Sequence, residues 1–254
     1  MQKKIVITGM SGLIGGLLRK DLATDYDLVA VNRRSLSGVR CFQADITDLQ
    51  SIAPAFEGAD VVIHLAALAV IGAPMEDTVA HNVIGTYNVF EAARQAGVSR
   101  IIFASSGAVV TGYELESPYR ELAEGPNFPL PENWEMITHL APPRPQGLYG
   151  CSKLWGESLG RMYSDEFGMS VLCVRIGAVR DADRPTNARE HAIWCSQRDI
   201  VQFMRLCITA PDDLKYDIFF AGSNNQRNYR DIGHARAVLG YEPQDSSDVF
   251  NEID

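Results

Sequence analysis

The sequence predicts an α/β fold in which a doubly wound parallel sheet is covered by helices on both faces. Short apolar runs alternate with amphipathic segments through the first half of the chain, and the apolar runs end in small or polar residues. The chain has 254 residues, a length that α/β folds commonly occupy as one domain. We therefore expect a single domain over 1–254, with a core over 1–177 and a small ligand-contacting region over 178–254.

The predicted strands are rich in Val, Ile and other β-formers. They cover 4–9, 28–32, 60–67, 100–106 and 171–177, with 215–222 as the best later candidate. Between them, segments 13–24, 78–97 and 153–168 place apolar residues at three- and four-residue spacing, which indicates helices. The carboxyl ends of parallel strands meet at one sheet edge, so we expect ligand-binding residues there.

Residues 113–147 interrupt this rhythm with seven prolines and an acidic bias. Irregular connections of this length are usually functional or disordered. The segment leads directly into Tyr149 and carries four aromatic residues, so a flap on the substrate side is favoured. A solvated surface excursion remains the alternative.

Composition narrows the classes of partner. The formal net charge of -9 provides no general electrostatic footprint for nucleic acid or an anionic membrane, so small molecules and other subunits are the expected partners. Five widely spaced cysteines without a CxxC pair indicate reduced thiols in a cytoplasmic protein. No apolar run approaches the length of a membrane span, and the N-terminal run is too short for a signal peptide.

A glycine motif, GMSGLIG, follows the first predicted strand and opens the first predicted helix. Glycines at these positions let the backbone turn tightly and approach a pyrophosphate at the helix N-terminus. This context favours a Rossmann-type dinucleotide site over a simple tight turn. The expected contacts are Gly9, Ser11, Gly12, Leu13, Ile14 and Gly15.

The second predicted strand ends in Asn32, Arg33 and Arg34. An acidic residue here would usually bind a free ribose 2′-hydroxyl, whereas a guanidinium fits a 2′-phosphate. NADP is therefore favoured, with NAD as the other cofactor the fold would accept. Two solvated surface arginines are the alternative interpretation.

Further cofactor contacts are expected where later strands end. Asp45 and Ile46 would hold the adenine, and small residues would line the path of the cofactor at Leu65, Ala66 and Ala67. His64 has no nameable partner and is interpreted as a hydrogen-bonded core histidine. We expect no metal site.

Tyr149 lies four residues before Lys153 at the start of a predicted helix, which places the two side chains on one face. A nearby ammonium would lower the pKa of the phenol and favour the phenolate. An ordinary surface pair is the alternative. Ser106 ends the strand 100–106, where its hydroxyl would hold a substrate oxygen while Tyr149 exchanges its proton.

Taken together, these motifs resemble the extended short-chain dehydrogenase/reductase family, which includes NAD-dependent epimerases and dehydratases. The resemblance spans about residues 3–180 and rests on GxxGxxG at 9–15, DI at 45, HLAA at 64, Asn82, SS at 105 and YGxSK at 149–153. It implies catalytic roles for Ser106, Tyr149 and Lys153, with Tyr149 and Lys153 also touching the cofactor. It adds Asn82 and Ile176 as cofactor contacts.

Within that family the chain resembles uronate dehydrogenases through FASS, GLYGCSK, GRMYSDEFG, VRIG and NAREHAIWCS. The resemblance makes Arg189 the residue that grips a sugar acid, with Ser106 beside it. Ala69 and Ala178 stand where the pattern has serines, and Gly107 stands where it has asparagine. Each replacement removes a polar contact from the expected substrate site.

The function favoured is an NAD(P)-dependent reductase or dehydrogenase acting on a small, sugar-like alcohol or carbonyl compound. A nucleotide-sugar epimerase or dehydratase would use the same residues, but its usual C-terminal domain is larger than 178–254. A dinucleotide-sensing module is a third interpretation, and it has no need of Ser106, Tyr149 and Lys153 together. The helices over 78–96 and 152–167 resemble those that pair as a homodimer interface in this family.

Overall fold

Seven parallel strands form one sheet in the computed structural model, which describes residues 2–70, 72–125 and 128–250. The spatial order is β3-β2-β1-β4-β5-β6-β7, and every neighbouring pair is parallel. The strands are β1 (Lys4–Thr8), β2 (Asp27–Asn32), β3 (Arg40–Gln43), β4 (Val61–His64), β5 (Arg100–Ser106), β6 (Ser170–Ile176) and β7 (Tyr216–Ala221). The predicted fold class is confirmed, and the predicted strands match to within a few residues.

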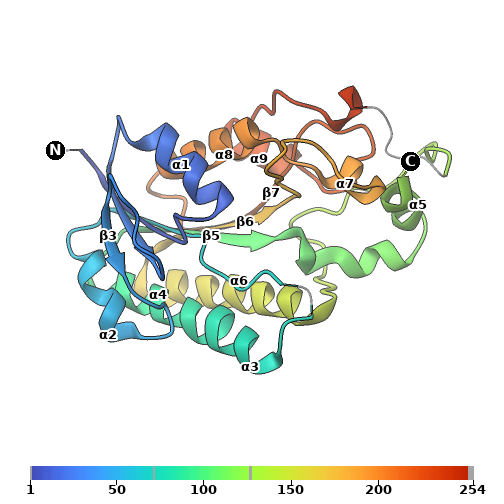
Figure 1. The fold of residues 1–254 in the computed structure, drawn as a ribbon. Helices are drawn as coiled ribbons and strands as arrows, with labels where there is room; N and C mark the ends of the chain where they lie inside the picture. Colours follow the sequence, from blue (N-terminus) through green and yellow to red (C-terminus); the bar gives the residue numbers. More distant parts are fainter. Residues whose placement is uncertain (1, 71, 126–127, 251–254) are drawn as a thin grey trace.

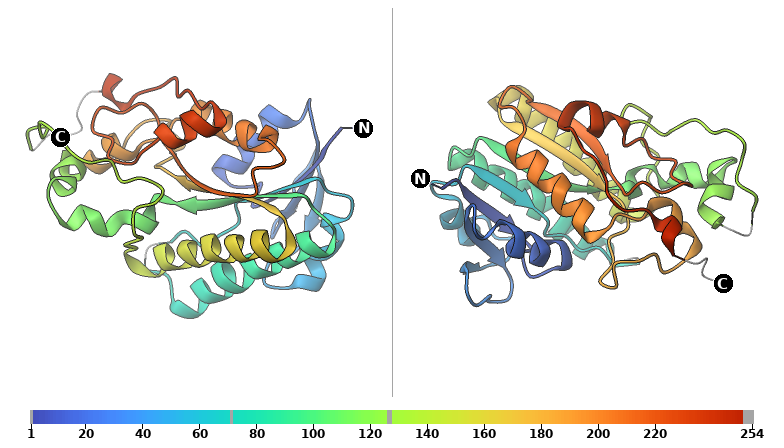
Figure 2. Two further views of the ribbon diagram at one scale, coloured as in Figure 1. Left: turned by 180° about the vertical axis from the view of Figure 1, so that it is seen from behind. Right: turned by 90° about the horizontal axis from the view of Figure 1, so that it is seen from above.

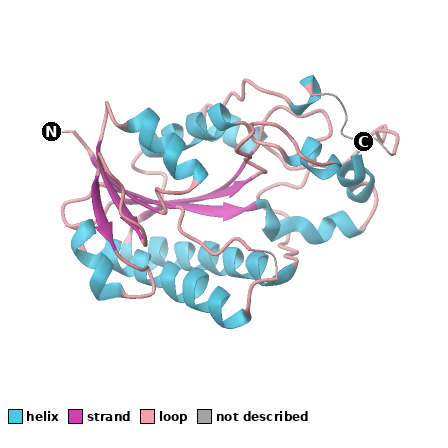
Figure 3. Ribbon diagram, viewed as in Figure 1, coloured by secondary structure: helices cyan, strands magenta, loops and turns pink. Residues whose placement is uncertain are grey.

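Helices cover both faces of the sheet (Figures 1 and 3). The α-helices are α1 (Leu13–Leu22), α2 (Leu49–Ile52), α3 (Met75–Thr78), α4 (Gly85–Gln95), α5 (Tyr119–Glu124), α6 (Gly147–Phe167), α7 (Ala188–Ile193), α8 (Gln197–Thr209) and α9 (Gly233–Leu239). Shorter or wider turns occupy η1 (Ala53–Phe56), η2 (Val79–Ile84), η3 (Gly107–Leu115) and η5 (Ser247–Val249). Among these described helices, none is long and apolar enough to cross a membrane.

Two apolar layers hold the sheet between the helices. On one face α1, α8 and α9 pack against the sheet, and on the other face α2, α4 and α6 do so (Figure 1). Central strands are buried on both faces, which explains their continuous apolar sequences. Residues beyond 177 share this core, because β7 pairs with β6 and α8 packs on the first layer.

Several segments gather beyond the carboxyl ends of β5, β6 and β7 (Figure 2), and they carry a third apolar cluster. It joins η3, α5, α7 and the segment after β7, and its buried members include Leu122, Ile137 and Tyr229. Ile137 also forms a parallel bridge with Arg230. The described part of the predicted flap at 113–147 therefore packs against the body of the protein, and residues 126–127 lie outside the described residues.

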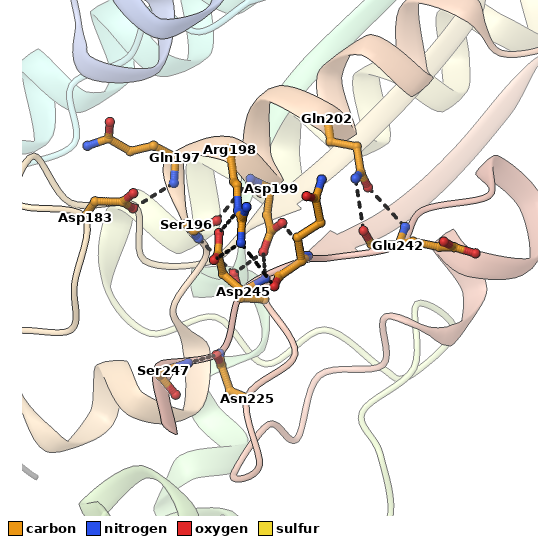
Figure 4. A network of polar contacts seen from close by, with 12 residues as sticks. Asp183, Ser196, Gln197, Arg198, Asp199, Gln202, Asn225, Glu242, Asp245 and Ser247 are labelled. Atoms are coloured by element: carbon orange, nitrogen blue, oxygen red, sulfur yellow. Dashed lines mark hydrogen bonds and ion pairs between the residues drawn. The ribbon is translucent and has the colours of Figure 1, made fainter. Parts of the chain in front are cut away.

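A polar network fixes the C-terminal segment on α8 (Figure 4). The fully buried carboxylate of Asp199 accepts hydrogen bonds from Ser223 Oγ at 2.6 Å, Gln244 N at 2.7 Å and Asp245 N at 3.2 Å. Arg198 adds a hydrogen bond from Nε to Asp245 at 2.6 Å. This network anchors the segment after α9, and the adjoining segment before α9 carries residues of the third cluster.

Candidate active site

The glycine loop closes tightly between β1 and α1. Gly9 has a φ of +72°, and an added Cβ there would lie 2.8 Å from the backbone nitrogen of Ala66. A Cβ on Gly15 would lie 2.5 Å from the Cα of Met10. Both positions therefore need glycine. The residues between them, Ser11, Gly12, Leu13 and Ile14, form the turn and the first positions of α1.

The N-terminus of α1 fits an anionic ligand. Gly12 caps the helix without a side-chain hydrogen bond, and no acidic residue occupies the first turn. The orphan N–H groups and the helix dipole therefore remain available to a pyrophosphate. Together with the close approach of the loop to Ala66, this meets the requirements of a dinucleotide at the switch point between β1 and β4.

Asn32 at the end of β2 is buried and accepts a hydrogen bond from Ser11 N at 3.1 Å. It therefore holds the glycine loop from its neighbouring strand. Arg33 and Arg34 follow on the surface, and neither forms an ion pair within the described residues. The structure thus leaves two exposed guanidinium groups where the ribose of a dinucleotide would lie.

The chain after β4 is fixed from both sides. Ala66 N donates to Thr8 Oγ1 at 3.2 Å, and Leu65 N donates to Thr8 O at 3.2 Å, which places Leu65, Ala66 and Ala67 beside the glycine loop. Asn82 is buried, accepts from Leu68 N at 2.7 Å and donates to Ser152 Oγ at 3.1 Å. Its amide thus links the loop after β4 to α6.

His64 is a core residue, as the sequence indicated. Its Nδ1 lies 2.7 Å from Thr8 Oγ1 and its Nε2 lies 3.2 Å from Thr86 Oγ1. Burial, with a smaller contribution from the charge of Lys153, lowers the pKa of His64 to about 3. The imidazole is therefore neutral at physiological pH.

Asp45 and Ile46 lie beyond β3, at the same end of the sheet. Asp45 Oδ1 accepts a hydrogen bond from Thr47 N at 2.9 Å. Ile46 is buried against Gly85, and its carbonyl accepts from Asn88 Nδ2 at 2.8 Å. Both residues are thus positioned by protein contacts at the adenine end of the expected site.

Ser106, Tyr149 and Lys153 come together at the end of β5. Tyr149 lies in the first turn of α6, one turn before Lys153, and the Ser106 side chain is close enough to act on the pKa of its phenol. Lys153 is buried, donates from Nζ to Ala104 O at 2.7 Å, and lies 5.5 Å from the centroid of the Tyr149 ring. Ile176, in the adjoining β6, pairs with Ser106.

The expected lowering of the Tyr149 pKa by Lys153 is wrong for this structure. Burial raises the pKa of Tyr149, and the hydrogen bond with Ser106 offsets only part of that rise. Burial also lowers the pKa of Lys153 to about 8, although the charge of Glu157 opposes this effect. The ammonium is directed to the Ala104 carbonyl, so desolvation dominates at both groups.

A buried ion pair that the sequence did not reveal lies behind these residues. Glu157 on α6 accepts from Arg175 Nε and Nη2 at 2.8 Å each, and from Ser105 Oγ at 2.6 Å. The Glu157 and Arg175 side chains are 2% and 3% exposed. The hydroxyl of Ser105, the residue before Ser106, is therefore used in a hydrogen bond that positions α6 against β5.

The substrate end lies around the third apolar cluster. Gly107 directly follows Ser106, and Arg189 stands on α7, where both its Nε and Nη2 donate to Glu114. Ala178 N donates to Ile193 O at 2.8 Å. Ala69 is exposed in the loop after β4. Thus, of the predicted substrate residues, Arg189 has an acidic partner that sequence reasoning did not anticipate.

A separate polar group contains His139, Asp217 and His234, whose ligand atoms lie within 4.8 Å of one another. The two imidazoles stack with centroids 3.6 Å apart and planes 14° apart. A metal ion must lie in the plane of each imidazole that binds it, at about 2.0 to 2.1 Å for zinc. This stacked arrangement therefore does not present a formed metal site.

Known proteins resemble this chain along nearly its whole length. A model described as "NAD dependent epimerase/dehydratase family" matches residues 5–235. The chain is 35% identical to the NAD-dependent glucose-6-phosphate dehydrogenase of Haloferax volcanii, and the match covers 98% of this chain and 96% of that protein. It is 32% identical to the L-arabinose 1-dehydrogenase (NAD(P)(+)) of the same organism, with 96% and 97% covered.

A solved structure also matches along nearly the whole chain. It is a mutant of uronate dehydrogenase from Agrobacterium tumefaciens complexed with NAD, with a TM-score of 0.83 and 32% identity over 98% of this chain and 88% of that one. The resemblance stated from the sequence motifs is confirmed.

The buried pair behind the site gives a stability prediction. Glu157→Gln keeps the shape but leaves the Arg175 guanidinium buried without its counter-ion, and it should lower the free energy of unfolding by about 3 to 5 kcal/mol. Urea denaturation followed by circular dichroism measures the loss. The control is Asp165→Asn, which removes an exposed pair with Arg161 on the same helix and should cost about 0.3 to 0.5 kcal/mol. Equal losses in the two variants would contradict the prediction.

Proposed function

The chain belongs to the NAD dependent epimerase/dehydratase family and is an NAD(P)-dependent oxidoreductase, and from that premise we propose that it oxidises a free sugar at its hemiacetal carbon. The observation that carries this proposal is the row of Ser106, Tyr149 and Lys153 at the strand ends next to the glycine loop. The relatives act on single sugars, and one of them is named for oxidation at position 1.

The chain's own residues would handle the oxygen and the proton. Ser106 holds the reacting hydroxyl, and Tyr149 accepts its proton as the C–O bond becomes a carbonyl of the lactone. Bound NAD(P)⁺ supplies the hydride acceptor. Lys153 lies one turn further along α6, where its buried ammonium donates to the Ala104 carbonyl and closes the inner end of the site.

A nucleotide-sugar epimerase remains the second candidate class, because it would use the same three side chains. The relatives that match along almost their full length favour the dehydrogenase. The five cysteines are all free thiols, which supports a reducing, cytoplasmic setting for this enzyme.

Tyr149→Phe tests the proposed base. The variant loses only the hydroxyl, so it should fold and bind NADPH while turnover of the best sugar falls by about 10² to 10⁴-fold. Nicotinamide absorbance measures turnover on glucose, L-arabinose, glucuronate and glucose 6-phosphate, and NADPH fluorescence measures binding. Tyr26→Phe, a half-buried phenol outside the site, is the matched control. Wild-type turnover by Tyr149→Phe would show that the phenol is not the base.

We propose that NADP is preferred over NAD because Arg33 and Arg34 are exposed beyond β2 and no acid stands there. Arg33→Asp should lower the ratio of kcat/KM for NADP to that for NAD by about tenfold or more, since a bidentate phosphate contact becomes a repulsion. Arg40→Asp, an exposed arginine at the other end of the neighbouring strand β3, should leave the ratio unchanged. Equal use of both cofactors by the wild type would remove the basis for the preference.

We also propose a symmetric homodimer through η2, α4 and α6, which lie next to each other on one face (Figure 2). Several large apolar side chains are exposed on them: Val79, Ile84, Tyr87, Leu148, Trp155 and Phe167. A face of this kind marks an interface in a closed dimer.

Trp155→Arg should convert the dimer to a monomer, because it places a charge in the proposed apolar contact. Light scattering at micromolar concentrations measures the mass. Val238→Arg changes an exposed apolar residue on α9, in the opposite layer, and should leave the mass unchanged. A monomeric wild type at these concentrations would overturn the proposal.

A further inference from the structure

An arginine that no sequence motif singled out lies directly beside the proposed catalytic serine. The Arg230 guanidinium packs over Gly107, the residue after Ser106, so closely that an added Cβ on Gly107 would lie 1.9 Å from Nη1. Arg230 is 4% exposed, and its Nε is buried without a hydrogen-bond partner in the described part of the chain. The glycine at 107 therefore makes room for a buried cation at the substrate end.

The backbone around Arg230 is held by the segment that the sequence identified as a flap. Ile137 N donates to Tyr229 O at 2.8 Å, and Asp231 N donates to Ile137 O at 3.0 Å. Tyr229 is fully buried in the third apolar cluster. The position of Arg230 is thus set by strand-like pairing and by packing, which makes it a fixed part of the site.

Glu114 is the acidic partner of this cation and of Arg189. Its Oε1 accepts from Arg189 Nη2 at 2.8 Å, from Arg230 Nη2 at 3.4 Å and from the Tyr229 hydroxyl, while Oε2 accepts from Arg189 Nε. Burial alone would raise the pKa of Glu114, but the hydrogen bond from Arg189 and the two guanidinium charges hold it below its usual range. The carboxylate is therefore ionised at neutral pH.

Of Glu114, Arg189 and Arg230, Arg189 is the most open to a ligand, because its side chain is 39% exposed. A free guanidinium binds a carboxylate through two parallel N–H groups. Here the Nε and Nη2 edge is occupied by Glu114. An anionic group of a substrate at Arg189 would also meet the negative charge of Glu114 within a few ångströms, in a partly buried setting where screening is weak.

We propose that Glu114 is a specificity-determining residue that takes the place of a substrate carboxylate on Arg189, so that the enzyme prefers an uncharged aldose to the corresponding uronate or sugar phosphate. The inference rests on the proposed function and assigns its substrate class. Arg230 acts as a positioning residue that keeps Glu114 in place and closes the space over Gly107. Hydroxyl groups of the sugar remain suitable ligands for the unoccupied N–H groups of Arg189.

Glucose and glucuronate form the matched test, because they differ only in a hydroxymethyl group against a carboxylate. Wild-type enzyme should have the higher kcat/KM for glucose. Glu114→Gln keeps the size and the hydrogen-bonding capacity but removes the charge. It should raise the ratio of kcat/KM for glucuronate to that for glucose by about 10- to 100-fold, with most of the change in KM.

Glu116→Gln is the control, since Glu116 forms a similar paired contact with Arg144 at 3.0 Å but is 65% exposed. It should leave the ratio unchanged. Arg230→Met removes a positive charge beside Glu114, so it should lower the ratio, in the direction opposite to Glu114→Gln. A wild-type preference for glucuronate or glucose 6-phosphate, or an unchanged ratio in Glu114→Gln, would overturn the inference.

A calorimetric arm separates this inference from the proposed function. Binding of glucose and glucuronate to the NADPH-loaded wild type and Glu114→Gln is measured directly, without turnover. If no sugar is oxidised but Glu114→Gln gains affinity for glucuronate over glucose by tenfold or more, the dehydrogenase proposal fails while the charge inference stands. If neither sugar binds either protein, both are overturned.

Discussion

The position of α6 depends on the buried pair of Glu157 and Arg175. Tyr149, Lys153 and Glu157 are spaced four residues apart on α6, so they form three steps along one helix face. Two of these residues hydrogen-bond to the end of β5, Lys153 to Ala104 O and Glu157 to Ser105, and Tyr149 lies near Ser106. Apolar packing alone is non-directional and would tolerate small shifts of the helix. The polar contacts set the position of α6 along β5. The ion pair between Glu157 and Arg175 of β6 holds that position at the most buried of the three residues.

Charge at the substrate end is partly offset within the protein. Two arginines converge there from α7 and from the chain after β7, and one glutamate from η3 lies between them. Isolated buried guanidinium groups would be costly, and the shared carboxylate reduces that cost. The same contact joins three segments that are distant in the sequence, and these segments also meet in the third apolar cluster.

The fold was largely predictable because its signals are local. Continuous apolar runs marked the strands, and the glycine loop and the Tyr149–Lys153 spacing marked the dinucleotide edge. The contacts that complete the site are not local. Glu114 and Arg230 are 116 residues apart, and Glu157 on a helix is indistinguishable in sequence from a surface charge. The pKa of Tyr149 depends on burial, which a one-turn spacing does not report. Seven prolines indicated a loop at 113–147, but not the bridge that pairs Ile137 with Arg230.

The parallel arrangement of the sheet also affects how the chain folds during its synthesis. Among the described residues all strand pairs in this sheet are parallel, so each pair forms only after a crossover connection has been made. During synthesis the first five strands emerge with β5 as an uncovered apolar edge, until β6 is released about 70 residues after β5 begins. The helices α8 and α9 arrive later still, so until then that face of the sheet is covered mainly by α1 in the nascent chain. Productive folding of this enzyme therefore competes with edge-to-edge association on the ribosome, and slower translation or a holdase bound to β5 should favour the native product.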